Sequence, residues 1–252
     1  MKPAAARVLG AAGSAGLLIL ALGAALSVRA QSPAESDVAK LEAALTAAPN
    51  DLKAGNDYRM AVIASAHGDK NTAKYDHAIA VFEKLVAENP NMSNLHLNHG
   101  FAIVDKIPAA GTITQVILAN SALGSFTKSI ELKPTWIAYY TRGNSYLFWP
   151  RIFMRTKYGI ADLEEAMKMQ KADQKRSYHV RTYISLGDGY WKMDDLAKAT
   201  ATWKEGLEQF PDSPALKDRL AKQGDDLQKL IDDSYDPSKR VDTSLQDLWA
   251  NQ

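Results

Sequence analysis

The 252-residue chain carries 30 lysines and arginines against 29 aspartates and glutamates, and 46% of its residues are apolar. The apolar content is ordinary for a folded protein and excludes wholesale disorder, while the balanced charge argues against nucleic acid as the main ligand. The sequence has no cysteine, which excludes disulfides, thiol catalysis and a lipid-modified N-terminal cysteine.

The first thirty residues have the pattern of an export signal. Two basic residues precede an uncharged stretch at 8–26, and Val28 and Ala30 are small enough for the −3 and −1 positions of a signal-peptidase site. We therefore predict a signal peptide over residues 1–30 and a periplasmic or secreted protein. The alternative is an uncleaved membrane anchor, which the short apolar core rich in glycine and alanine disfavours.

An internal repeat runs through most of the chain after this segment. Its first mark is an alanine, followed after four positions by an aromatic residue and after eight more by a proline. The pattern fits at Ala78, Phe82 and Pro90, at Ala122, Phe126 and Pro134, and at Ala199, Trp203 and Pro211. Degenerate copies occur around Leu163 and Leu41. Agreement of one spacing in three copies is a specific signal of a repeat protein.

A second mark precedes the last of these copies. Tyr183, Leu186, Gly187 and Tyr190 follow the spacing aromatic-x2-Leu-Gly-x2-Tyr. Together with the first mark, these residues resemble the tetratricopeptide repeat (TPR) family, whose unit is two antiparallel helices. The resemblance covers roughly residues 37–230, and it implies an all-α fold and a protein-binding function.

The fold implied for residues 31–235 is a right-handed α-solenoid of about four antiparallel helix pairs with a C-terminal capping helix. Small residues such as Gly187 and Ala199 are expected to let the two helices of a unit cross closely, while Trp203 fills the space between successive units. Pro211 ends the second helix of its unit because it lacks an amide hydrogen.

The C-terminal part is expected to close the stack of helices. Leucines at helical spacing within residues 213–231 predict one capping helix with a polar outer face. Residues 236–252 then form a tail, in which a short helix would dock Leu245, Leu248 and Trp249.

The repeats are longer than usual. The bulky second-helix positions are 44, 37 and 40 residues apart, at Phe82, Phe126, Leu163 and Trp203. The common repeat has about 34 residues, so we predict extra residues between the two helices in three units. One insertion is the apolar segment 103–121, which is expected to be a packed connector or else a loop or helix extension over the groove. The other prominent insertion is 147–158.

The resemblance also implies groove-lining positions on the first helices of three consecutive units. They are Asn94, Leu97 and Phe101, then Ile137, Tyr140 and Asn144, then Arg181, Ile184, Asp188 and Trp191. This mix of aromatic, amide and charged groups resembles a peptide-binding groove, which combines apolar contact with hydrogen bonds. The alternative is that neighbouring helices cover half of these side chains.

The segment 147–158 concentrates aromatic side chains together with positive charge. Trp149, Arg151 and Phe153 stand near its centre, and exposed groups of these types dominate interface energetics. They predict a second contact with a partner or, alternatively, a contact with an anionic membrane surface. A third interpretation is that the aromatic rings fold back onto the core, where large aromatic side chains are mostly found.

No pattern in the chain predicts catalysis, a cofactor or a metal site. His96 and His99 share a face of one expected helix, but no third ligand follows at a telling spacing. The sequence also lacks a nucleophile elbow, a glycine-rich phosphate loop and a HExxH motif. We therefore expect an exported, non-enzymatic scaffold that binds a protein or peptide and no nucleic acid. The alternative function is a small-molecule binding protein, in which the insertions close the groove into an apolar pocket.

Overall fold

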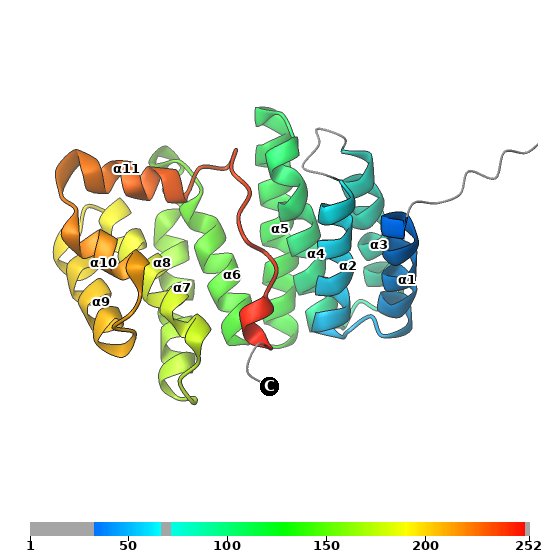
Figure 1. Cartoon of the computed structure of the whole chain (residues 1–252), viewed down its shortest axis with the longest axis horizontal. Coiled ribbons are helices and arrows are strands. Elements are labelled where there is room, and N and C mark those ends of the chain that lie inside the picture. Colours follow the sequence, from blue (N-terminus) through cyan, green and yellow to red (C-terminus); the bar gives the residue numbers. More distant parts are fainter. Residues whose placement is uncertain (1–32, 67–71, 250–252) are drawn as a thin grey trace, which may run out of the picture. The chain divides into compact units, whose positions relative to one another are not determined.

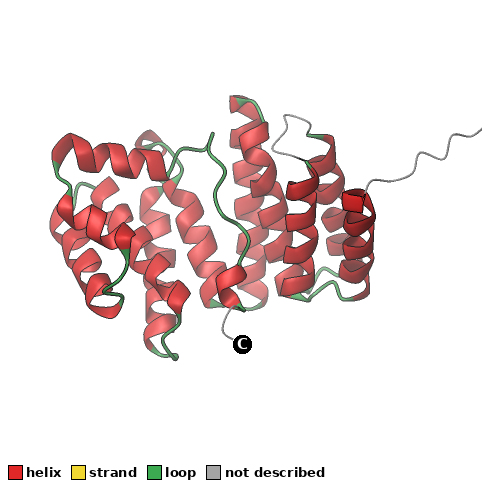
Figure 2. Ribbon diagram, viewed as in Figure 1, coloured by secondary structure: helices red, strands yellow, loops and turns green. Residues whose placement is uncertain are grey.

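The computed structural model describes residues 33–66 and 72–249, so the predicted signal peptide lies outside the described residues. Residues 32–252 form one compact unit. Within the described ranges every regular element is a helix (Figure 2), as the repeat predicts. None of these helices combines the length and the apolar composition that crossing a bilayer requires.

Eleven α-helices follow one another along the described ranges (Figure 1). They are α1 (Pro33–Ala47), α2 (Leu52–Ser65), α3 (Ala73–Glu88), α4 (Ser93–Lys106), α5 (Thr112–Leu132), α6 (Trp136–Leu147), α7 (Thr156–Lys171), α8 (Val180–Lys192), α9 (Leu196–Gln209), α10 (Pro214–Ala221) and α11 (Gly224–Ser234). The short 3-10 helices are η1 (Ile107–Ala109), η2 (Arg151–Phe153), η3 (Ser177–His179) and η4 (Gln246–Leu248). After α1 come the antiparallel pairs α2–α3, α4–α5, α6–α7 and α8–α9, and each pair packs against the next. The first pair is the loosest, because α2 packs mainly against α1 and α4. The predicted all-α stack of helix pairs is confirmed.

In the pairs α4–α5 and α8–α9, a glycine of the first helix lies against a bulky side chain of the second. A Cβ atom added at Gly100 would lie only 2.3 Å from the ring of Phe126, and one at Gly187 would lie 2.2 Å from the indole of Trp203. Neither ring can retreat, because both are buried. These positions therefore need glycine for the close helix approach that the repeat pattern predicts.

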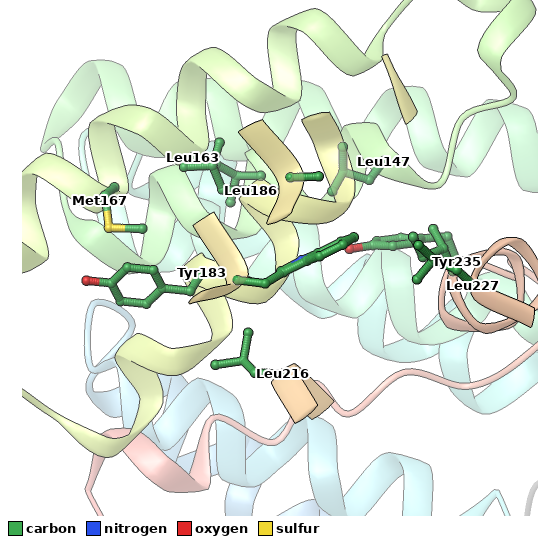
Figure 3. Packing of buried hydrophobic residues seen from close by; sticks show 11 residues of the cluster. Leu147, Leu163, Met167, Tyr183, Leu186, Leu216, Leu227 and Tyr235 are labelled. Atoms are coloured by element: carbon green, nitrogen blue, oxygen red, sulfur yellow. The ribbon is translucent and has the colours of Figure 1, made fainter. Parts of the chain in front are cut away.

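Buried apolar side chains form three clusters along the stack. The first lies among α1–α4 around Phe82, the second among α4–α6 around Phe126, and the third between α6 and the end of α11 around Trp203. Figure 3 shows the third cluster, to which α6, α8, α10 and α11 all contribute. The small residues of the repeat are almost fully buried and so face neighbouring helices, as predicted: Ala78, Ala122 and Ala199.

The C-terminal cap differs from the prediction in one respect. The segment expected to be a single helix forms two, α10 and α11, because the backbone at Lys222 and Gln223 is extended. Gly224 then adopts a φ of +52°, a conformation that glycine reaches without strain. The leucine spacing within 213–231 survives this break, since both helices present leucines to the stack.

Of the three predicted insertions, two lie within a helix pair as predicted, and the third does not. Residues 103–121 form no long loop, because α4 continues to Lys106, η1 follows at once, and α5 begins at Thr112. Residues 147–158 do form an irregular connection around η2. The third insertion was predicted within a pair, which is wrong: only residues 193–195 join α8 to α9, and the extra residues lie at 172–179, between α7 and α8.

Candidate functional site

A pocket of about 290 Å³ opens between the first half of α5, helix α6 and the C-terminal segment. We call the described residues 236–249 the tail, and this cavity the tail pocket. Both predicted insertions contribute to its wall, with Val116 from one and Phe153 from the other. Its apolar lining includes Phe101, Trp136, Tyr140, Phe148 and Trp149. The pocket is therefore an apolar cavity that the insertions help to close.

The tail is bound to the helix stack by a buried polar cluster, which we call the tail junction. The Arg59 guanidinium donates to Asp105 Oδ2 at 2.8 Å, to Asn98 Oδ1 at 3.3 Å and to the Thr243 carbonyl oxygen at 3.0 Å. The Thr243 hydroxyl donates to Asp105 Oδ1 at 2.6 Å. All four residues are buried, so each charge is compensated where water is excluded.

The tail makes further contacts on both sides of this junction. Arg240 donates to the Asp105 carbonyl oxygen at 3.0 Å and to the Tyr75 hydroxyl at 2.8 Å. Arg181 on α8 pairs with Asp247 at 2.7 Å and with Asp242 at 3.5 Å. Figure 1 shows the tail, in red, running from α11 past α6 and α5. The tail thus lies along the first helices of the pairs, held by residues of α2, α3, α4 and α8.

Leu245 and Leu248, which were predicted to dock, line the tail pocket. Leu245 also packs against the buried cluster around Phe126. The expected short helix is η4, a single 3-10 turn preceded by Leu245 at a φ of +53°. The sequence indicated these apolar contacts, but it gave no sign that Thr243 and Arg240 would bond to α2, α3 and α4.

The structure brings together six of the eleven predicted partner-binding residues. Those that line the tail pocket are Phe101, Tyr140, Asn144, Trp149, Phe153 and Arg181. Tyr140 stacks on Trp136 with ring centroids 5.1 Å apart, and Asn144 accepts a hydrogen bond from Ser185 at 2.9 Å. Phe101, Tyr140, Asn144 and Arg181 converge because α4, α6 and α8 turn the same face toward the tail, while Trp149 and Phe153 reach the pocket from the insertion after α6.

Two predicted groove residues are in fact core residues, with 0% of their surface exposed: Leu97 and Asp188. Leu97 belongs to the apolar cluster around Phe126. A partner cannot touch either side chain in this structure, so the prediction that Leu97 and Asp188 line the groove is wrong. The error arises because a first helix packs against helices on more than one side, and sequence position alone does not say which side faces outward.

The other predicted residues lie outside the pocket. Asn94 bonds to Asn50 through its backbone and its side-chain amide, at 3.0 Å in each case. Arg151 is exposed, pairs with Asp194 at 2.6 Å and stacks on Trp191 with its guanidinium 5.0 Å from the ring centroid. Trp149, by contrast, is buried, so the aromatic segment is divided between core and surface.

Asp188 belongs to a second buried polar cluster, which we call the cap junction. The Arg219 guanidinium donates to its two oxygens at 2.6 and 2.7 Å, and the Tyr235 hydroxyl donates to Oδ2 at 3.0 Å. Burial first, and then the neighbouring Asp188 carboxylate, raise the pKa of Tyr235 well above its usual value. The phenol therefore stays a hydrogen-bond donor, and the cluster fixes α10 and the end of α11 to α8.

The two histidines on α4 have structural partners. His96 Nε2 lies 2.9 Å from the Pro90 carbonyl oxygen, and His99 Nδ1 lies 3.2 Å from the Ser125 hydroxyl. Burial, followed by repulsion from His96, lowers the pKa of His99 to about 4. Over residues 33–66 and 72–249, no group of three or more histidine or carboxylate side chains is placed to hold a metal ion.

Comparison with known proteins supports the fold. No protein-family profile and no curated protein sequence matches the chain. Among solved structures it is similar to TTC0263, a thermophilic TPR protein of Thermus thermophilus, with a TM-score of 0.53 and 19% sequence identity over 73% of this chain and 87% of that chain. It also aligns with the MamA protein, with a TM-score of 0.45 and 15% identity over 74% of this chain and 85% of that chain. The likeness to TTC0263 shows that the chain has a TPR-like fold.

Proposed function

We propose that this protein is an exported, non-enzymatic scaffold that binds an extended segment of a protein or peptide beside its tail. One observation carries the proposal: the face formed by α2, α4, α6 and α8 already holds an extended polypeptide, which is the tail itself. The tail is bound there through side chains, through a backbone carbonyl oxygen and through leucines. Hydrogen bonds to the main chain together with pockets for side chains are a common way for proteins to hold an extended peptide.

The tail pocket supplies the free part of this surface. Its apolar rings stand next to polar groups of Asn144 and Arg181, and such a mixture gives a partner both apolar burial and oriented hydrogen bonds. A partner segment lying along the tail would place one apolar side chain in the pocket. The aromatic insertion contributes Phe153 to the rim and Trp149 to the wall, which would make it part of the same contact.

Site-specific photo-crosslinking tests the proposal. A photoreactive amino acid in place of Lys239, an exposed residue of the tail that lines the pocket, should capture the partner in the compartment where the protein works. The same amino acid in place of Lys84, an exposed residue on α3, is the matched control. Equal capture at both positions, or none at position 239, would contradict the proposal.

A substitution in the pocket sharpens this test. Asn144→Ala should reduce capture at least severalfold, because the amide borders the pocket and its loss removes only one hydrogen bond to Ser185. Asn94→Ala is its control, since Asn94 is a half-buried amide on the preceding first helix and does not line the pocket. Circular dichroism on both variants checks that the helices are retained.

Export is a separate part of the proposal and rests on the N-terminal pattern. The protein recovered from the periplasm or the medium should begin at Gln31, as determined by N-terminal sequencing. A protein that keeps residues 1–30, or that stays with the cytoplasmic fraction, would contradict this part without affecting the binding proposal.

A small apolar molecule is the second candidate ligand. The observation that favours it is the volume of the tail pocket, about 290 Å³, close to the lower end of small-molecule pockets at about 300–1,000 Å³. Native mass spectrometry of the purified protein should then show a bound molecule. Ala119→Phe, which fills the pocket, should remove it, while Ala201→Phe on the exposed side of α9 should not. A bound mass that both variants retain would place the molecule elsewhere.

A further inference from the structure

Exposed apolar side chains gather on the two insertions. Ile113 and Ile152 are 80% and 84% exposed, which is far more than their hydrophobicity favours. Among the described residues, seven of the nine large apolar side chains that are exposed belong to the insertions; the seven are Ile113, Val116, Ile117, Ile152, Phe153, Met154 and Tyr158. We call the first six of them the apolar edge.

Contacts between the insertions join the apolar edge into one surface. Val116 and Phe153 line the same pocket. Arg155 donates to Asn120 Oδ1 at 2.8 Å, and its guanidinium lies 3.7 Å from the centroid of the Trp149 ring. The first turns of α5 and the η2 segment are therefore held side by side.

The most exposed side chains of the edge project from two segments of the insertions. Ile113 and Ile117 project from the first turns of α5, whose N-terminal end protrudes beyond its neighbours in Figure 1. Ile152 and Met154 project from the η2 turn, where Met154 has a φ of +53°. A non-glycine residue in this conformation is strained and persists because its surroundings fix it. Aliphatic side chains that project at fixed positions can be buried by a deformable surface. A rigid partner would need a surface of matching shape to bury them.

Charge along the two insertions is mainly positive, and an acidic partner at the edge is Asp194 of the α8–α9 turn, which pairs with Arg151. Between residues 107 and 161 the only acidic residue is Glu131, at the far end of α5, where it pairs with Lys128. The basic residues of the same stretch are Lys128, Lys133, Arg142, Arg151, Arg155 and Lys157. A second copy of the chain would bring like charges together across this edge, which disfavours self-association. An anionic surface would be attracted to it.

We infer that the apolar edge docks on an anionic lipid bilayer. The isoleucines and Met154 enter the interfacial region of the membrane, while Arg155 and Lys157 meet lipid phosphates. Aliphatic burial and electrostatic attraction are the two components that hold interfacial proteins on anionic membranes. The inference is independent of the peptide site, because the most exposed side chains of the edge, Ile113, Ile117, Ile152 and Met154, do not line the tail pocket.

Vesicle co-sedimentation tests the inference. The protein is used as residues 31–252, since the apolar stretch at 8–26 would bind vesicles by itself and residues 32–252 form a compact unit of their own. Binding is expected with vesicles of phosphatidylglycerol and phosphatidylcholine, and much less with phosphatidylcholine alone. Added salt should weaken the binding, because exposed charges are screened.

Two double substitutions locate the surface. Ile113→Ser with Ile117→Ser should weaken binding by roughly tenfold, because two aliphatic side chains no longer leave water. Ile113→Val with Ile117→Val is the matched control, because it keeps two aliphatic side chains at the same exposed positions. The control should bind as the parent does. Equal losses in both variants would overturn the assignment to the insertions.

A spectroscopic measurement completes the test, and the absence of native cysteine makes it simple. A polarity-sensitive dye on Ile117→Cys should shift to shorter wavelength when anionic vesicles are added, whereas the same dye on Lys217→Cys, exposed on α10, should not. Three results would each overturn the inference: no binding to anionic vesicles, equal binding to neutral ones, or a dimer in solution that the serine pair at 113 and 117 converts to a monomer.

Discussion

The tail junction and the cap junction are built from the same chemistry but connect different parts of the chain. Each contains a buried arginine–aspartate pair and one buried hydroxyl, contributed by Thr243 in the first and by Tyr235 in the second. At the cap junction, Asp188 bonds to residues 31 and 47 positions further along the chain. At the tail junction, Arg59 bonds to a residue 184 positions away.

Because the bonded residues are separated by such different distances in the sequence, the two junctions have different roles. The cap junction lies inside the repeat order, because α10 and α11 simply follow α9 in the stack. The tail junction lies outside that order, since it joins α2 and α4 to residues beyond the last helix. Loss of the first should therefore unfold the C-terminal end of the stack, whereas loss of the second should release the tail and leave the helices in place.

The largest effect is expected from Arg219→Met at the cap junction. The substitution leaves the Asp188 carboxylate buried without its cation, which costs about 3–5 kcal/mol of unfolding free energy. Urea denaturation followed by circular dichroism measures it. Lys222→Met is the control, since its partner Asp218 is exposed and such pairs contribute about 0–1 kcal/mol. Similar losses in the two variants would show that the cap junction is not buried.

Acid should weaken the tail side of the stack through His99, on the same helix as Asp105. Burial holds its pKa at about 4 in the folded chain, against 6.5 when unfolded. The neutral ring thus contributes stability above pH 6.5, and this contribution is lost as the pH falls toward 4, by about 3 kcal/mol in total. The measurement compares urea denaturation at pH 7 and pH 4 for the parent and for His99→Leu. Parallel pH dependence in both would exclude His99 as the cause.

A smaller loss is expected from Thr243→Val at the tail junction. The hydroxyl hydrogen bond to Asp105 disappears while the ion pair to Arg59 remains, so the cost is about 1–3 kcal/mol. Hydrogen exchange should accelerate over residues 240–249 and stay unchanged in α10 and α11. Gln246→Ala is the control, since Gln246 is an exposed residue of the same tail, and its exchange should match the parent. Faster exchange in the cap would remove the distinction between the junctions.

The smallest effect is expected from Arg181→Gln. Its pairs with Asp242 and Asp247 are half exposed, and such pairs contribute less than about 1 kcal/mol. The difference from the parent should shrink further in high salt, as screening predicts. A loss comparable to that of Arg219→Met, measured by the same urea denaturation, would mean that the tail contributes as much as the cap.

The fold could be predicted from the sequence because its determinants are local. Gly187 and Trp203 belong to one helix pair, and their spacing recurs, so the pattern needs no knowledge of distant contacts. Even α2 carries a readable signal, since Gly55 and Tyr58 keep the glycine-x2-tyrosine spacing of Gly187 and Tyr190. That signal was missed because the aromatic and leucine positions before it are absent.

The candidate site could be predicted only in part. Tyr140, Asn144 and Arg181 were predicted because they occupy groove-lining positions on the first helices of successive repeats. The structure brings all three to one pocket. The repeat pattern could not predict the bond between Arg59 and Thr243. The tail contains no repeat, and Arg59 lies in a repeat unit far from the tail in the sequence. The same lack of information led to Leu97 and Asp188 being assigned to the groove, although neighbouring helices cover them.

The bond between Arg59 and Thr243 has a consequence for the order in which the chain matures. Repeats that touch only their neighbours can form one after another and can also fray from either end. Here, the first repeat acquires its last partner only when the final residues have been synthesised and released, because domains begin to fold from the N-terminal side during synthesis. Until then, the Arg59 guanidinium lacks the Thr243 carbonyl, and a chain truncated before residue 243 never completes its first repeat.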